Sequence, residues 1–123
     1  DDHCSAIDLL IKDGQADQTY CLSGNSEYSN IEIIKKICKI IDKLKPRENN
    51  KSYTDLIKFV DDRPGHDFRY ALDSSKIKNN LGWRPNESLD TGLSKTINWY
   101  INNESWWRRI QKMHYNQERL GIL

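Results

Sequence analysis

The densest group of side chains that could do chemistry lies in residues 61–70, which read Asp-Asp-Arg-Pro-Gly-His-Asp-Phe-Arg-Tyr. This stretch follows a β-prone run at residues 56–60, and ligands of α/β proteins bind in loops beyond the carboxyl ends of strands. Pro64 and Gly65 suit the two central positions of a type II turn, because Pro fixes φ and Gly accepts a positive φ. Such a turn would hold Arg63 and His66 at defined angles.

Arg63 and His66 are side chains suited to a phosphorylated ligand. The Arg63 guanidinium can bind phosphate through two parallel N–H···O hydrogen bonds, a geometry that the Lys ammonium group cannot provide. The His66 ring donates to phosphate or sugar oxygens near neutral pH. The spacing alone also fits a solvated turn in which Arg63 pairs with Asp61, Asp62 or Asp67, and the residue types leave both interpretations open.

A second polar group comprises residues 23–30, where a short β-prone run enters a glycine-containing loop and then a helix. Helix N-termini present free N–H groups that attract anions. Gly24 alone does not make a dinucleotide-binding or P-loop pattern. The alternative is that Ser29 or Asn30 only caps the helix.

Apolar periodicity and capping residues predict the elements that position these groups. The helices are expected at residues 3–12, from a Ser29–Glu32 capping box to Leu44, from Asp73 or Ser74 to Leu81, from Ser88 to Ile101 and at residues 104–113. The β-prone runs at residues 19–22 and 56–60, with an extended stretch near residues 69–72, predict two or three short strands. Strands alternating with helices indicate an α/β fold. We expect the helices to cover either a small sheet of these short strands or a sheet contributed by sequence outside this chain.

The composition excludes several classes of protein. The 123 residues fit one domain, residues 1–123, and a net charge of +1 creates no strong field for nucleic acid or acidic lipid. No apolar stretch approaches the roughly 18 residues of a membrane span. Three cysteines without C-x-x-C spacing fit neither a disulfide framework nor a zinc site, so we expect buried free thiols and a cytoplasmic protein.

Two further patterns concern catalysis and stacking on bases. No tyrosine is followed four residues later by lysine, and no glycine-rich dinucleotide loop is present, so the chain carries no self-contained catalytic set. Trp106 and Trp107 beside Arg108 and Arg109 have the residue types that stack on bases. Tryptophans that pack helices, with solvated arginines beside them, are the favoured interpretation.

Residues 62–73 resemble the D-R-P-G-H-D-x-R-Y-A-x-D signature of dTDP-glucose 4,6-dehydratases, which are extended short-chain dehydrogenase/reductases. The resemblance continues through residues 81–85 and 103–107. Upstream, Asp2, His3 and Ala6 resemble a D-H-x-x-A segment, and residues 20–30 resemble Y-N-I-G-G-x-N-E-x-x-N. In that last segment this chain departs from the family with Cys21 and Ser23-Gly24.

The resemblance implies a C-terminal, substrate-binding lobe of a Rossmann-type enzyme whose N-terminal NAD-binding domain and Tyr-Lys pair lie outside this chain. The family converts dTDP-glucose to dTDP-4-dehydro-6-deoxy-glucose and water, on the way to rhamnose, as a cytoplasmic homodimer that uses NAD. Arg63 would then bind the diphosphate, and the other residues of the dTDP site would be Asn30, Asp62, Pro64, Gly65 and His66. The alternatives are a non-catalytic nucleotide-sugar-binding or interaction module, or part of a related nucleotide-sugar epimerase.

Overall fold

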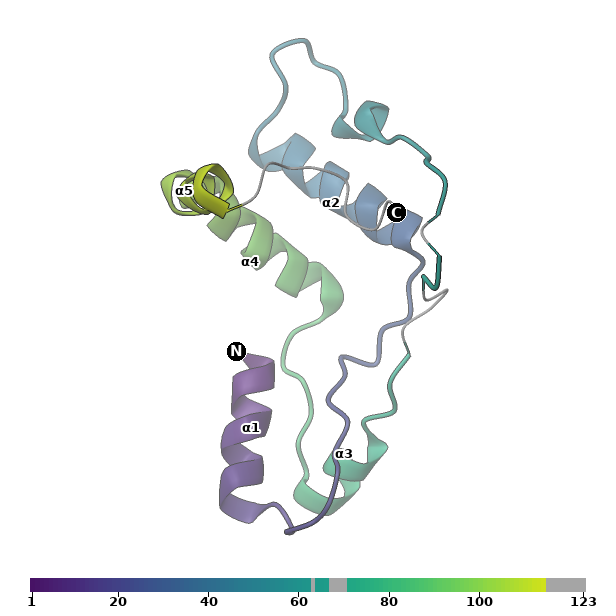
Figure 1. Cartoon of the computed structure of the whole chain (residues 1–123), viewed down its shortest axis with the longest axis vertical. Helices are drawn as coiled ribbons and strands as arrows, with labels where there is room; N and C mark the ends of the chain where they lie inside the picture. The colour runs from purple at the N-terminus through teal and green to yellow at the C-terminus, as the bar shows by residue number, and fades with distance from the viewer. Residues whose placement is uncertain (63, 67–70, 115–123) are drawn as a thin grey trace. The chain divides into compact units, whose positions relative to one another are not determined.

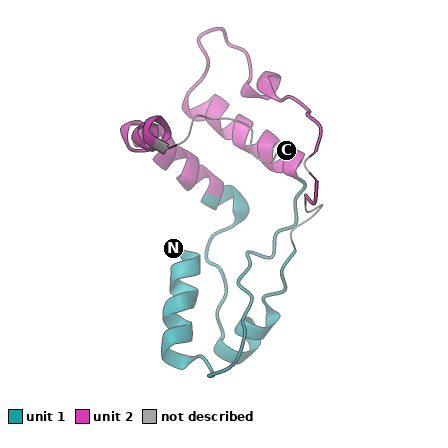
Figure 2. Ribbon diagram, in the orientation of Figure 1, with its two compact units in different colours: residues 1–29, 69–92 teal, residues 30–68, 93–123 magenta. Residues whose placement is uncertain are grey.

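The computed structural model describes residues 1–62, 64–66 and 71–114, which form two compact units (Figures 1 and 2). Unit 1 comprises Asp1–Ser29 and Arg69–Gly92, and unit 2 comprises Asn30–Phe68 and Leu93–Leu123. The elements are α1 (Asp2–Asp13), α2 (Asn30–Leu44), the 3-10 helix η1 (Tyr53–Leu56), α3 (Ser75–Leu81), α4 (Leu89–Asn102) and α5 (Glu104–His114). The single nucleotide-sugar-binding domain at residues 1–123 stays a prediction.

The predicted helices are confirmed, and their ends follow from local chemistry. At the start of α4, the Ser88 hydroxyl accepts from the Thr91 N–H at 3.2 Å, while the Ser88 N–H donates to the Thr91 hydroxyl at 3.0 Å. This reciprocal arrangement satisfies donors that a helix start leaves unpaired. At the end of α3, Gly82 has a φ of +72° and its N–H donates to the carbonyl of Lys78, an ending that favours glycine.

The short strands predicted at residues 19–22 and 56–60 are wrong, because the described residues contain no strand. Residues 69 and 70 of the third predicted stretch lie outside the described residues. Leu56 ends the 3-10 helix η1, and residues 57–60 are irregular. Phe59 and Val60 expose 87% and 70% of their surface. A β-prone run becomes a strand only when a neighbour pairs its N–H and C=O groups and covers one face, and β-propensity mostly measures that packing. The run at residues 19–22 is likewise irregular.

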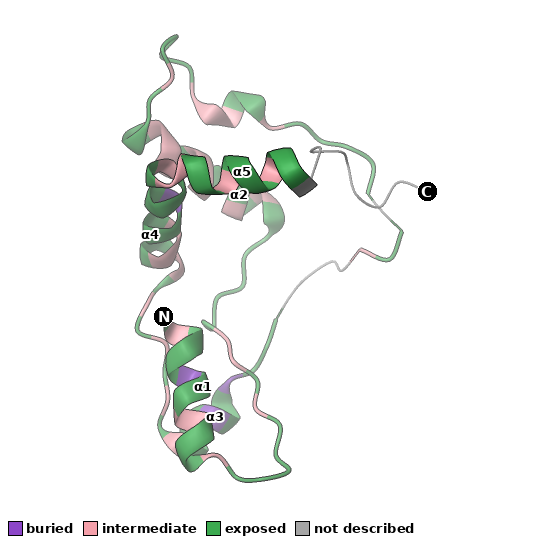
Figure 3. Ribbon diagram, turned by 60° about the vertical axis from the view of Figure 1, so that its left-hand side comes forward, coloured by how far each residue is buried: buried purple, intermediate pink, exposed green. Residues whose placement is uncertain are grey.

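Unit 1 is held by a small core and by a carboxylate clamp. Ala6 of α1 and Ile77 of α3 are fully buried (Figure 3). The Asp2 carboxylate accepts from the backbone N–H groups of Asn86 and Glu87 at 3.1 and 2.9 Å. Since these partners are more than 80 residues apart in the sequence, the clamp fixes the segment before α4 against the first turn of α1.

In unit 2, one carboxylate joins the end of α2 to η1. Asp42 Oδ2 accepts from the Ser52 hydroxyl at 2.6 Å, and Oδ1 accepts from the Tyr53 N–H at 2.8 Å. The Ser52 hydroxyl, followed by the Tyr53 N–H, lowers the pKa of the Asp42 carboxyl, because both bonds favour its charged form. The Arg47 guanidinium also donates to the carbonyl of Ser52, at 3.1 Å. These bonds order the loop between the two helices.

The tryptophans of α4 and α5 pack against each other, as predicted. The rings of Trp99 and Trp106 meet edge to face, with centroids 5.2 Å apart. Trp107 Nε1 donates to the carbonyl of Tyr100 at 2.9 Å, and the Arg108 guanidinium lies over the Trp107 ring. These contacts give the aromatic residues a packing role within unit 2.

The cysteines are free, as predicted, but the expectation of burial is wrong for two of them. Cys4 and Cys21 are exposed, and Cys38 is half-buried. The cause is the small core: among the described residues only Ala6, Ser74, Ile77 and Ile97 are buried, so most apolar side chains keep solvent contact (Figure 3).

Within the described parts of the chain, no helix combines the length and the apolar character that crossing a membrane requires.

Candidate functional site

The turn that follows η1 brings Asp62 and His66 together. Gly65 has a φ of +69°, the left-handed backbone expected for it in a type II turn after Pro64. Across this turn, Asp62 Oδ1 and His66 Nδ1 lie 2.6 Å apart. The Asp62 side chain is 72% exposed and that of His66 is 29% exposed, so the ring is the better-covered partner. The pair can present an oriented imidazole to a ligand.

The other predicted residues of this site lie at the bend, at the start of α2 or outside the described residues. Pro64 and Gly65 are exposed at the bend. Asn30 is the exposed first residue of α2, in the same unit as the turn. Arg63, with its alternative partner Asp67, lies outside the described residues. The structure therefore shows a contact between Asp62 and His66, and it places Asn30 at the start of α2.

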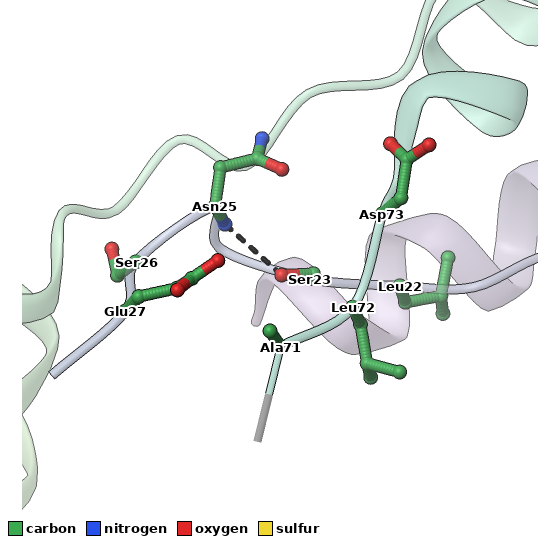
Figure 4. A pocket seen from close by; sticks show the side chains of 8 residues that line it. All are labelled: Leu22, Ser23, Asn25, Ser26, Glu27, Ala71, Leu72 and Asp73. Carbon is green, nitrogen blue, oxygen red and sulfur yellow. Dashed lines mark hydrogen bonds between the residues drawn. The ribbon is translucent and has the colours of Figure 1, made fainter. Parts of the chain in front are cut away.

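Unit 1 contains a cavity of about 570 Å³ that the sequence did not predict (Figure 4). Its walls are the loop at residues 22–27 and the segment Ala71–Asp73. Asn25 has a φ of +50°, its N–H donates to the Ser23 hydroxyl at 3.1 Å, and its Oδ1 accepts from the hydroxyl of buried Ser74 at 2.9 Å. These bonds tie the loop to the start of α3 and shape the cavity.

The polar side chains of this cavity are two carboxylates, two hydroxyls and one amide. It is lined by Leu22, Ser23, Asn25, Ser26, Glu27, Ala71, Leu72 and Asp73, and none of these carries a positive charge. The Asp73 carboxylate accepts from the Ser75 N–H and hydroxyl, both at 2.8 Å. The N–H bond and then the hydroxyl bond lower the pKa of Asp73. Among the described residues that line the cavity, a negatively charged phosphate finds no cation.

Comparison with known proteins identifies the family. Residues 1–96 match a family model described as GDP-mannose 4,6 dehydratase. The chain belongs to this dehydratase family.

Individual relatives of this chain have a narrower name than the family model. The chain is 45% identical over its whole length to a dTDP-glucose 4,6-dehydratase of Escherichia coli. It is 44% identical over its whole length to a probable dTDP-glucose 4,6-dehydratase of Sinorhizobium fredii (strain NBRC 101917 / NGR234). These matches span 34% and 35% of the two relatives, so the chain covers about a third of their length. The resemblance to dTDP-glucose 4,6-dehydratases is thereby confirmed.

A solved structure supports the same relationship. The chain matches the crystal structure of a dTDP-glucose 4,6-dehydratase from Bacillus anthracis str. Ames in complex with NAD, with a TM-score of 0.72 and 36% sequence identity. The match covers 89% of this chain and 32% of the Bacillus protein. The chain therefore corresponds to about a third of such an enzyme.

The described residues of this dehydratase chain do not fit NAD. A dinucleotide site needs a glycine-rich turn that lets the backbone approach the pyrophosphate at a helix start. The loop before α2 has only Gly24, and the neighbouring cavity has carboxylates and no cation. In addition, the described residues contain no group of three or more His, Cys, Asp or Glu side chains arranged to hold a metal ion.

The cavity wall at Ala71–Asp73 is what the sequence reasoning missed in this dehydratase chain. These three residues belong to the stretch that resembles the family signature, so a signal was present. Their pairing with the loop at residues 22–27 was not readable, because the residues lie almost 50 positions apart. The bond between Asn25 and Ser74 is a single long-range contact without any sequence pattern.

Proposed function

We propose that this chain is the part of a dTDP-glucose 4,6-dehydratase that binds the dTDP moiety of the substrate. The complete protein converts dTDP-glucose to dTDP-4-dehydro-6-deoxy-glucose and water. Relatives of that name, 44–45% identical along the whole chain, carry this proposal. They give no support to the alternatives of an epimerase or a separate interaction module.

The proposed dTDP site combines the turn and the start of α2. Arg63 grips the diphosphate, His66 contacts the nucleotide sugar from the same turn, and Asn30 contacts the nucleotide from the first turn of α2. The observed φ of Gly65 and the contact of Asp62 with His66 support a turn that presents side chains at fixed angles. Pro64 contributes by fixing φ at the bend.

NAD belongs to the part of the complete protein that corresponds to the remaining two-thirds of its relatives. This assignment follows from the lack of fit between NAD and the described residues, and from the NAD complex of the Bacillus relative. When bound, NAD supplies the redox chemistry of the reaction. The lobe formed by this chain, by contrast, anchors the nucleotide end of the substrate.

The exposed apolar side chains support a role as one lobe of a larger fold. Ile11, Leu56, Phe59, Val60, Leu72 and Met113 each expose more than half of their surface. Apolar exposure on this scale favours packing against further protein. In the complete protein we propose that other segments cover these side chains, within a Rossmann-type fold that works as a cytoplasmic homodimer in rhamnose biosynthesis.

The test is turnover of dTDP-glucose by the complete protein, with Arg63→Ala and Arg63→Lys as variants. We expect Arg63→Ala to weaken transition-state binding by about 1.5–3 kcal/mol, the range for a hydrogen bond to a charged group. Arg63→Lys keeps the charge but loses the paired N–H geometry, so it should restore only part of kcat/KM. No 4-dehydro-6-deoxy product from the wild-type protein would contradict the assigned reaction. An unchanged KM in Arg63→Ala would contradict the phosphate role.

A further inference from the structure

The contact across the Pro64–Gly65 turn carries one further inference, which rests on the proposed function. We infer that Asp62 is a positioning residue for His66: its carboxylate holds ring atom Nδ1 and leaves Nε2 to accept a hydrogen bond from a hydroxyl group of the bound nucleotide sugar. Asp62 then acts on the ligand through the ring of His66.

The geometry of the turn makes this contact specific. The 2.6 Å separation of Oδ1 and Nδ1 is short for a nitrogen–oxygen hydrogen bond, as expected when one partner is charged. The positive φ of Gly65 reverses the chain, so side chains four positions apart meet without a helix. Replacing Gly65 would strain this backbone, because a side chain disfavours the left-handed region.

The contact also selects the tautomer of the ring. A carboxylate only accepts, so in the neutral ring the proton must lie on Nδ1 for this bond to form. Nε2 then carries a lone pair. Among the described residues His66 makes no other hydrogen bond, and its side chain is 29% exposed, so Nε2 can receive a ligand group.

The tautomer decides the chemical class of that group. A lone pair on Nε2 accepts from a hydroxyl and repels a phosphate oxygen. A sugar nucleotide offers hydroxyls on its ribose or deoxyribose and on its hexose, while its diphosphate is assigned to Arg63. The Arg63 guanidinium would therefore bind the charged diphosphate, and the His66 imidazole would bind a neutral hydroxyl.

The first experiment measures the tautomer directly in the 123-residue chain. Long-range ¹⁵N–¹H NMR spectra of the histidine rings are recorded at a pH where His66 is neutral, with His66→Gln to assign its signals. We expect the Nδ1–H form to dominate in the wild type and to give way to the Nε2–H form in Asp62→Ala. The control is Asp61→Ala, which removes the same charge one residue earlier and should leave the tautomer unchanged. A wild-type ring in the Nε2–H form, or equal spectra for Asp62→Ala and the wild type, would overturn the inference.

The second experiment tests the consequence for the substrate in the complete protein. Asp62→Ala is expected to raise the KM for dTDP-glucose about tenfold, with a smaller change in kcat, because a hydrogen bond to the bound sugar is weakened in the ground state as well. If Asp62 acts through His66, adding Asp62→Ala to His66→Gln costs nothing further, whereas independent effects multiply. Multiplying effects would refute positioning. Absence of any turnover by the wild type would instead refute the proposed function, and the tautomer spectra would still decide the role of Asp62.

Discussion

The Asp2 clamp gives the sharpest prediction about the fold. Replacing Asp2 with Ala removes the acceptor of two backbone N–H groups, those of Asn86 and Glu87, at 3.1 and 2.9 Å. A hydrogen bond to a charged group contributes about 1.5–3 kcal/mol. The N–H of Asn86 is exposed and regains water, whereas that of Glu87 is partly buried and is left without its partner. Because only the Glu87 N–H is left without a partner, the loss in unfolding free energy should be about 2–3 kcal/mol, within the range for one such bond.

The matched control is Asp8→Ala in the same helix. Within the part of the chain that the structure describes, Asp8 pairs with Lys12 one turn away, at 2.7 Å, and both side chains are more than 60% exposed. Such a solvent-exposed pair contributes little to stability, because water screens it. Urea unfolding followed by circular dichroism should therefore separate the two variants by about 2 kcal/mol. Amide exchange should also accelerate at Glu87 in Asp2→Ala alone. Equal stability of the two variants would refute the idea that the clamp ties residues 86–87 to α1.

Three other substitutions test different parts of the structure. Ile77→Ala should cost about 2–5 kcal/mol in chemical unfolding because it opens a cavity at a fully buried site, whereas Ile11→Ala, at a side chain that is 80% exposed, should change stability by less than about 1 kcal/mol. The Asp42 carboxyl has a lowered pKa, so its stabilising effect is present above its unfolded pKa and is lost as pH falls through the folded value. In Ser52→Ala, which removes one cause of that shift, the free energy of unfolding should therefore depend less on pH below about pH 4. An identical pH profile in the variant and the wild type would count against the Ser52–Asp42 bond. Gly82→Ala should lower stability by about 1 kcal/mol because of the φ of +72°, which thermal unfolding would show, and a neutral effect would speak against the left-handed helix ending.

The helices were predictable because their signals are local. The Ser88 cap, the stop at Gly82 and the apolar stripe of α2 depend on residues within a few positions of each other. The same holds for the Pro64–Gly65 turn, in which a fixed φ meets a residue that accepts a positive φ. Local chemistry therefore gave both the elements and the bend that presents the candidate site.

The lack of strands among the described residues and the presence of the cavity were not predictable, since both depend on partners far away in the chain. Phe59 and Val60 have strand-forming side chains, yet they remain irregular and exposed in the described structure. The burial predicted for Cys4 and Cys21 was wrong for the same reason, because apolar neighbours in the sequence do not ensure cover in space. Similarly, the Asn25–Ser74 bond that shapes the cavity of unit 1 spans 49 positions.

The most direct measurement of the central claim is a crystal structure of the complete protein with dTDP-glucose bound. The account predicts that both outer nitrogens of the Arg63 guanidinium lie within hydrogen-bonding distance of diphosphate oxygens, about 2.7–2.9 Å. It also predicts His66 Nε2 next to a sugar hydroxyl, with Nδ1 still on Asp62. An Arg63 side chain that faces solvent while the diphosphate is held by other residues would contradict it.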